Sequence, residues 1–259
     1  MIQSPQGFVV ATECRKAAAN NGFRRDLGET DGWSRFGSTT AKGFIALAAD
    51  GPHGPWFLAL DHAGVADELR LSSTDMAGPG LARYAFATLT ELYATLPRLY
   101  SLALTLPDGP LETFLIAVQN MPSQTDVERL AIRRVGQDIF RDRLLIYWDR
   151  RRPLTGIVEP ELLRASHIRA WKDCETDSER LNVHNGLLLS ALWDAAFDRG
   201  LVTFEDDGAP RFAPSLSPTA HAELRWNAPI ALNDQHRLRL IWHRERVFGR
   251  HREVQLGPV

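Results

Sequence analysis

The sequence contains only two cysteines, Cys14 and Cys174, among 259 residues. Two thiols cannot form a four-cysteine zinc site, and a single pair does not establish a disulfide framework. No apolar run reaches the roughly 18–20 residues that a membrane-spanning helix needs. The first ten residues, MIQSPQGFVV, show no basic segment followed by an apolar core, so we see no secretory signal. We therefore expect a cytoplasmic globular protein with no membrane partner and with one large or two modest domains.

A strong net charge is also absent, since the formal value is −2. The charges are unevenly distributed: residues 1–125 hold 9 Lys and Arg against 12 Asp and Glu, and residues 126–259 hold 21 against 20. Arg129–Arg152 contains eight Arg against three Asp, and His236–Arg252 contains six Arg against one Glu. Such basic segments can contact phosphate groups. Each is also typical of a solvated helix face or a tail.

Residues 1–122 are expected to form a mixed α/β domain. The patterns predict a helix over 4–22, strands at Phe44–Leu47 and Trp56–Leu60, a helix from Leu81 to Pro97, a strand at Tyr100–Leu106 and a linker at Pro122–Thr125. An apolar strip over residues 86–104 could form either a homodimer surface or the core of this domain.

Residues 123–259 are expected to form a second domain that begins with a long helix. Thr125 can cap this helix, with Glu128 completing a capping box, and Gly136 could kink or split it. Further along, the patterns predict short strands at PLTGI (153–157) and RASHIRAW (164–171), a helix at Leu187–Asp198 and a hairpin at Leu201–Phe212 with a DDG turn.

Four polar residues in the second domain fit the hydrolysis of a phosphodiester. His167 lies near the end of a predicted strand, and Asn185 precedes a predicted helix that carries Asp194 and Asp198 on one face. A histidine can accept a proton from water near neutral pH, and a divalent metal can stabilise the departing oxygen. An Asn amide can orient the imidazole or fix the loop that carries it. Taken singly, each of these residues also has an ordinary structural explanation.

Residues 135–208 extend this pattern as a continuous stretch: VGQDIFRDRLLIYWDRRRPLTGIVEPELLRASHIRAWKDCETDSERLNVHNGLLLSALWDAAFDRGLVTFEDDG. This stretch resembles the HNH endonuclease family of ββα-metal nucleases, especially bacterial HNH restriction-endonuclease-like proteins. The resemblance implies an α+β protein whose N-terminal mixed α/β domain is followed by a ββα-metal nuclease domain. It also implies that His167 is the general base, that Asn185 is the motif Asn and that Asp194 binds the metal.

The sequence departs from the family at several positions. Asp194 stands where many relatives have a histidine ligand, and a carboxylate favours Mg²⁺ or Mn²⁺ over Zn²⁺. Asp198 could be a second ligand or could stabilise the fold. Ser166 stands where relatives have an acidic or His ligand, and Arg152 stands where relatives often have Cys, so no structural zinc is expected.

Three further residues were considered as nucleic-acid contacts. Arg164 and Arg169 flank His167 and could clamp phosphate oxygens. His184 could contact phosphate or could be a surface residue before a turn. Trp148, Trp171 and Trp193 are more typical of packing residues than of base-stacking platforms.

These observations predict a metal-dependent DNA endonuclease of the bacterial restriction type, and leave open whether it depends on modified bases. The segment WSRFGSTTAKGF offers Ser38, Thr39, Thr40 and Lys42 beside Trp33 and Phe36, as a pocket for a flipped base or as part of a plain scaffold. The alternative function is a catalytically weak or inactive HNH-fold protein that binds nucleic acid. RNA remains open as a substrate.

Overall fold

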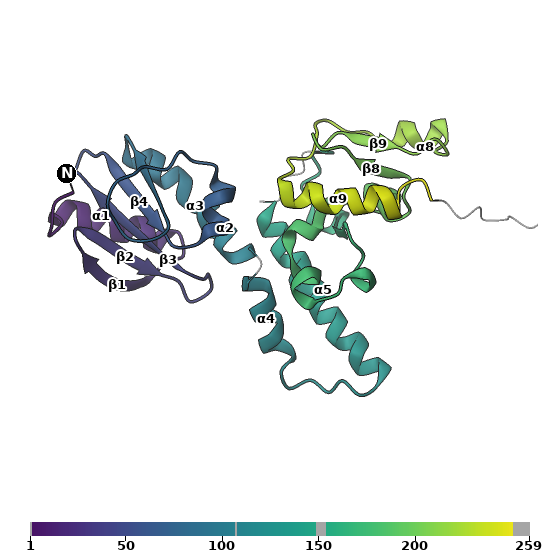
Figure 1. The fold of residues 1–259 in the computed structure, drawn as a ribbon, viewed down its shortest axis with the longest axis horizontal. Helices are drawn as coiled ribbons and strands as arrows, with labels where there is room; N and C mark the ends of the chain where they lie inside the picture. Colours follow the sequence, from purple (N-terminus) through teal and green to yellow (C-terminus); the bar gives the residue numbers. More distant parts are fainter. Residues whose placement is uncertain (1, 107, 149–153, 251–259) are drawn as a thin grey trace, which may run out of the picture. The chain divides into compact units, whose positions relative to one another are not determined.

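The protein folds into two compact units. The computed structural model describes residues 2–106, 108–148 and 154–250. The units comprise Met1–Gly109 and Pro110–Val259 (Figure 1). The sequence places the division at residues 122/123, whereas the compact units divide earlier, because helix α4 (Asp108–Val118) contacts the long helix that follows it. Within the part of the chain described here, no helix is both long and apolar enough to cross a membrane.

The first unit is built on an antiparallel sheet with strands in sequential order. Its strands are β1 (Arg25–Thr30), β2 (Trp33–Gly37), β3 (Phe44–Ala49), β4 (Trp56–Leu60) and β5 (Ala82–Phe86). Helices α1 (Phe8–Asn20) and α3 (Leu89–Thr105) pack on one face, and α2 (Ala63–Leu69) lies between β4 and β5 in the chain. The predicted first helix and the two predicted apolar strands are thereby confirmed.

The predicted helix at 81–97 and the predicted strand at 100–106 are wrong. Residues 82–86 form β5, and α3 continues through Pro97 to Thr105. Thr88 and Glu91 form a capping box that fixes where α3 begins. Leu92, Leu96, Leu99 and Leu102 recur at helical spacing and are buried, which outweighs the one hydrogen bond that Pro97 cannot donate. Much of the apolar strip at 86–104 is therefore core of this unit.

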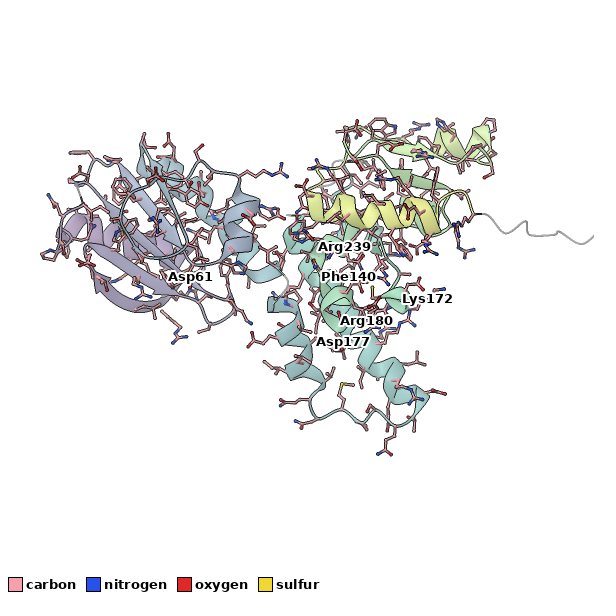
Figure 2. All side chains as sticks on the ribbon, viewed as in Figure 1. Asp61, Phe140, Lys172, Asp177, Arg180 and Arg239 are labelled. Atoms are coloured by element: carbon pink, nitrogen blue, oxygen red, sulfur yellow. The ribbon has the colours of Figure 1, made fainter. Side chains whose placement is uncertain are left out.

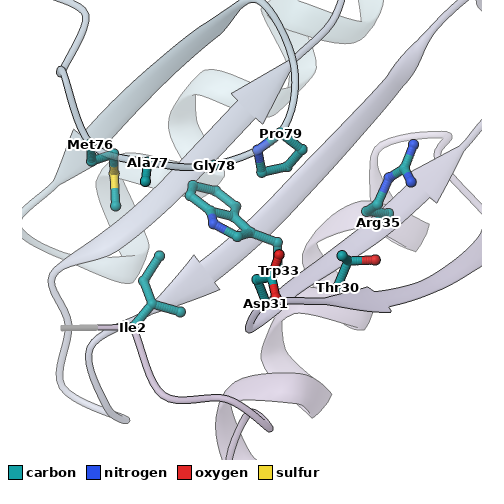
Figure 3. Close-up of a pocket in the computed structure, with 9 residues that line it drawn as sticks. All are labelled: Ile2, Thr30, Asp31, Trp33, Arg35, Met76, Ala77, Gly78 and Pro79. Atoms are coloured by element: carbon teal, nitrogen blue, oxygen red, sulfur yellow. The ribbon is translucent and has the colours of Figure 1, made fainter.

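The other face of the sheet carries a cleft of about 700 Å³ (Figure 3). Residues 71–80, which have no regular structure, run over this face, and a Cβ atom at Gly78 would lie 2.7 Å from the Trp33 ring. The cleft is lined by Ile2, Thr30, Asp31, Trp33, Arg35 and residues 76–79. The lining includes Trp33 but none of Ser38, Thr39, Thr40 and Lys42, and Phe36 points to the helix-covered face.

The second unit contains the long helix and two small hairpins. Its elements are α4, α5 (Asp126–Tyr147), η1 (Pro160–Leu162), β6 (Leu163–His167), η2 (Trp171–Asp173), α6 (Asp177–Leu181), η3 (Val183–Asn185), β7 (Gly186–Ser190), α7 (Ala191–Asp198), β8 (Val202–Phe204), β9 (Pro210–Phe212), α8 (Pro218–Glu223) and α9 (Asp234–Arg246). Antiparallel pairs form between β6 and β7 and between β8 and β9. The hairpin with the DDG turn is confirmed, with Gly208 at φ +85°.

The β6–β7 pairing corrects two sequence predictions. Residues 187–190 are strand rather than helix, and α7 begins only at Ala191. Leu154–Ile157 of the predicted PLTGI strand have no strand structure, and Pro153 lies outside the described residues. The partner of β6 is therefore β7, which follows it in the chain. Periodicity could not reveal this, since a short apolar run suits a buried strand as well as a helix.

The N-terminus of α5 is confirmed as predicted, with a capping box formed by Thr125 and Glu128. Gly136 does not split the helix, which runs unbroken to Tyr147. A Cβ atom at Gly136 would lie 2.5 Å from the Trp171 ring and 3.2 Å from Phe114. The glycine thus allows α4 and the Trp171 loop to approach α5 closely.

We therefore predict that Gly136→Ala destabilises the protein although alanine has the higher helix propensity. The propensity gain of about 1 kcal/mol is outweighed by overpacking, which typically costs about 1–3 kcal/mol. Thermal unfolding should show a lower melting temperature for Gly136→Ala. The control Gln137→Ala, at an exposed position one residue on, should remain within about 0.5 kcal/mol of the parent. A melting temperature for Gly136→Ala at or above that of the parent would contradict this packing role.

Candidate active site

The end of β6 places His167 against α5. The His167 ring stacks on Phe140 with the ring centroids 3.8 Å apart, and Trp171 meets it edge-on at 5.7 Å (Figure 2 labels Phe140). In the hairpin, His167 pairs with Gly186, where a Cβ atom would lie 2.5 Å from Phe140. The glycine is thus required for α5 to cover this face of the hairpin. These contacts fix the plane of the imidazole.

A single hydrogen bond sets the tautomer of His167. Its Nε2 lies 2.9 Å from the carbonyl oxygen of Arg180, and a carbonyl can only accept, so Nε2 carries the proton. Nδ1 then holds the free lone pair, and no described residue bonds to it. Burial lowers the pKa of His167 to about 4, against the opposing effect of the Arg180 carbonyl and with a further lowering by Arg133. Although the ring keeps some exposed surface, it is packed between two aromatic side chains. At neutral pH it is therefore an uncharged base.

The Arg180 carbonyl is itself held in place by the Arg180 side chain. The guanidinium donates to the carbonyls of Trp171 (3.2 Å) and Cys174 (2.5 Å) and pairs with Asp177 at 2.9 Å. These bonds brace the 171–180 loop from within. The position of the His167 ring thus depends on a loop that is stabilised by one arginine.

Asn185 connects the same loop to the hairpin. Its side chain is fully buried; Oδ1 accepts from the Arg169 amide at 2.9 Å, and Nδ2 donates to the Arg169 carbonyl at 3.1 Å. Nδ2 also lies 3.3 Å from the Cys174 sulfur. An amide with all its groups engaged inside the protein has none left for a substrate. The geometry therefore makes Asn185 a positioning residue, the second of the two roles considered from the sequence.

The carboxylates of α7 offer oxygen donors. Partial burial and, less strongly, the negative charge of Asp194 together raise the pKa of Asp198 to about 6, against the opposing effect of Arg199. Asp194 and Asp198 are four residues apart on α7 and therefore lie on the same face of the helix. Asp198 nevertheless keeps exposed surface.

Ser166 adds a buried hydroxyl that has no hydrogen-bond partner among the described residues. Because side chains alternate along a strand, Ser166 lies on the face of β6 opposite His167. Helix α7 packs against β6. Two carboxylates and a hydroxyl are hard oxygen donors, which suit Mg²⁺ or Mn²⁺. In the described ranges, however, no group of three or more His, Cys, Asp and Glu side chains is arranged to hold a metal ion.

The three residues expected to contact phosphate lie in different environments. Arg164 is exposed and donates to the carbonyls of Glu161 and Leu163. Arg169 pairs with Glu179 at 2.8 Å and with Glu175 at 3.4 Å, so its charge is already compensated.

His184 is 7% exposed, and its ring lies 5.6 Å from Tyr147 and 5.2 Å from His236. Neither a phosphate contact nor a surface turn describes this buried position. Trp148 and Trp193 are core residues, as expected.

Sequence reasoning missed two parts of the site. Phe140 belonged to the apolar side of the predicted helix, but nothing in the pattern linked it to His167. The Arg180 carbonyl could not have been predicted from the sequence, because every residue carries the same backbone carbonyl group. Only the fold determines which carbonyl lies next to His167. A search for acceptors within reach of a candidate base requires the fold.

Residues 152–205 match a family model described as HNH endonuclease. This segment contains β6, β7 and α7 and therefore His167, Asn185, Asp194 and Asp198. No curated protein matches the chain. The second unit of this mixed α/β protein thus contains a segment that matches the HNH endonuclease family.

We predict that Asn185→Ala destabilises the second unit. The substitution leaves the partly buried amide of Arg169 without its acceptor, which costs about 1–3 kcal/mol. Urea unfolding monitored by tryptophan fluorescence measures the loss. Asn120→Ala, at an exposed position in the same unit, is the control and should change stability by less than about 0.5 kcal/mol. Equal stability of the two variants would show that the Asn185 amide does not hold the loop.

Proposed function

We propose that the protein is a metal-dependent DNA endonuclease in which His167 is the general base. The observation that carries this proposal is the hydrogen bond from His167 Nε2 to the Arg180 carbonyl. Burial keeps the ring uncharged at neutral pH, and this bond places its proton on Nε2, so that Nδ1 is free to accept a proton from water. The match of residues 152–205 to the HNH endonuclease family supports nuclease chemistry at this site.

The roles of the other residues follow from their positions. Phe140 and Trp171 hold the imidazole plane, so that Nδ1 keeps one direction while a water molecule loses its proton to it. Asp194 and Asp198 would hold the metal, with Ser166 as a neutral oxygen donor. A bound Mg²⁺ or Mn²⁺ would supply charge stabilisation for the phosphate and its departing oxygen.

The first unit is proposed to select the substrate. Residues 1–122 and 123–259 remain our proposed recognition and nuclease domains, with the basic C-terminal segment in the latter. The cleft on the sheet face that the helices leave uncovered supports this assignment, because Arg35 lines it. The Arg35 guanidinium lies 4.3 Å from the centre of the Phe44 ring and has no acidic partner among the described residues. We further propose that the protein is a bacterial restriction enzyme, that it depends on modified bases and that it cuts both strands as a homodimer.

A second candidate is an inactive HNH-fold protein that binds nucleic acid. It is favoured by Ser166, which stands at a position where relatives have a stronger ligand, and by the lack of a three-residue ligand cluster in the described ranges. Binding of DNA without metal uptake and without nicking would support this candidate. Metal-dependent nicking would eliminate it.

The test is cleavage of supercoiled plasmid by the full chain with Mg²⁺ or Mn²⁺, using modified and unmodified DNA. His167→Ala should lower the nicking rate about 10²- to 10⁴-fold while leaving DNA affinity nearly unchanged, because a general base acts on the reaction rather than on binding. Asp194→Ala should instead raise the metal concentration needed for half-maximal rate.

His53→Ala, at an exposed histidine of the first unit, is the control and should cleave like the parent. If His167→Ala lowers the melting temperature but keeps the specific activity of the folded protein, His167 is structural. That result would rule out the proposed base.

A further inference from the structure

One face of α5 contacts His167 and Trp171, and this face continues toward the N-terminus of the helix. Arg133, Gly136 and Phe140 recur at spacings of three and four residues and therefore share this face. His167 stacks on Phe140, and Trp171 lies over Gly136. Arg133 is the next residue of this row toward the N-terminus of α5.

Arg133 differs from several other α5 arginines in having no partner. It is exposed, and among the described residues it makes no hydrogen bond or ion pair. By contrast, Arg129 pairs with Asp126 at 2.6 Å. Arg141 donates to two carbonyls, and Arg143 donates to a threonine hydroxyl. The charge of Arg133 is thus directed at solvent beside the base.

Lys172 is a second cation of this kind. It follows Trp171, whose ring edge meets His167, and it is exposed without a hydrogen bond or ion pair to any described residue. Figure 2 shows its side chain extending outward from the unit. Its neighbour Asp173 is the one acidic residue beside it in the chain. The other carboxylates of this loop are engaged elsewhere: Asp177 pairs with Arg180, and Glu175 and Glu179 pair with Arg169.

An exposed cation without an intramolecular partner can bind an anion without first breaking an ion pair. For Arg169, in contrast, a phosphate would have to displace two glutamates. We propose that Arg133 and Lys172 bind phosphate groups of the DNA backbone beside His167 and so deliver the scissile phosphodiester to the base. This inference rests on the proposed nuclease function and identifies the residues that hold its substrate. Contacts of this type position the strand and carry no sequence information.

The experiment measures the affinity of the full chain for a fluorescent duplex oligonucleotide by anisotropy over a range of salt concentrations, together with plasmid nicking. The variants are Arg133→Gln, Lys172→Gln and the double variant. Arg134→Gln is the matched control, since Arg134 is exposed and unpaired among the described residues but lies on a different face of the same helix. Thermal unfolding checks that every variant is folded.

Each phosphate contact contributes about 0.9 to the slope of log K against log salt. Arg133→Gln and Lys172→Gln should each reduce this slope by about that amount and weaken binding to all sequences alike. The double variant should lose about twice as much. Nicking at subsaturating DNA should fall in parallel with affinity. Arg134→Gln should keep both the parental slope and the parental rate.

Two results would overturn the inference. The slopes of Arg133→Gln and Lys172→Gln could equal that of a parent that cleaves DNA, in which case the phosphate is held elsewhere and the proposed function stands. Alternatively, Arg134→Gln could lose as much as Arg133→Gln, which would indicate diffuse attraction rather than a defined site. Failure of the proposed function itself looks different, because the parent then nicks no DNA with either metal.

Discussion

The site depends on one hydrogen bond, from His167 Nε2 to the carbonyl oxygen of Arg180. This bond decides which ring nitrogen is protonated and therefore which one can act as a base. Much of the nearby structure serves to keep its two ends in place. Phe140 holds the ring, the Arg180 guanidinium braces the loop that provides the acceptor, and Asn185 ties that loop to the hairpin. The loss of any of these contacts would therefore displace the imidazole, although none of these groups is itself the proposed base.

The register of the β6–β7 hairpin sets the second constraint. Neighbouring residues of a strand point to opposite faces, so His167 faces α5 while the unpartnered Ser166 hydroxyl faces the other way. A shift of one residue would exchange the two faces. Gly186, paired with His167, fixes the register because its Cβ position is occupied by Phe140. The hairpin thus places the proposed base and one of the proposed metal donors, Ser166, on opposite faces although they are adjacent in the chain.

Features with local causes could be predicted from the sequence, and features with distant causes could not. The capping box at Thr125 and the DDG turn depend on adjacent residues, and both are confirmed. His167 and Asn185 were found through a family resemblance that spans continuous sequence. The strand nature of residues 187–190 depends on pairing with β6, and the continuation of α3 through Pro97 depends on packing of its apolar face. The burial of His184 depends on Tyr147 and His236, both far from it in the chain.

The most direct test of this account is a nitrogen-15 and proton NMR titration of the His167 ring in the folded protein. We expect a neutral ring at pH 7 with the proton on Nε2 and a bare Nδ1, and we expect protonation only as the pH falls through about 4. That result would establish an uncharged base whose free nitrogen is Nδ1. A ring protonated on Nδ1 at pH 7, or one that titrates at its ordinary value near 6.5, would contradict the account.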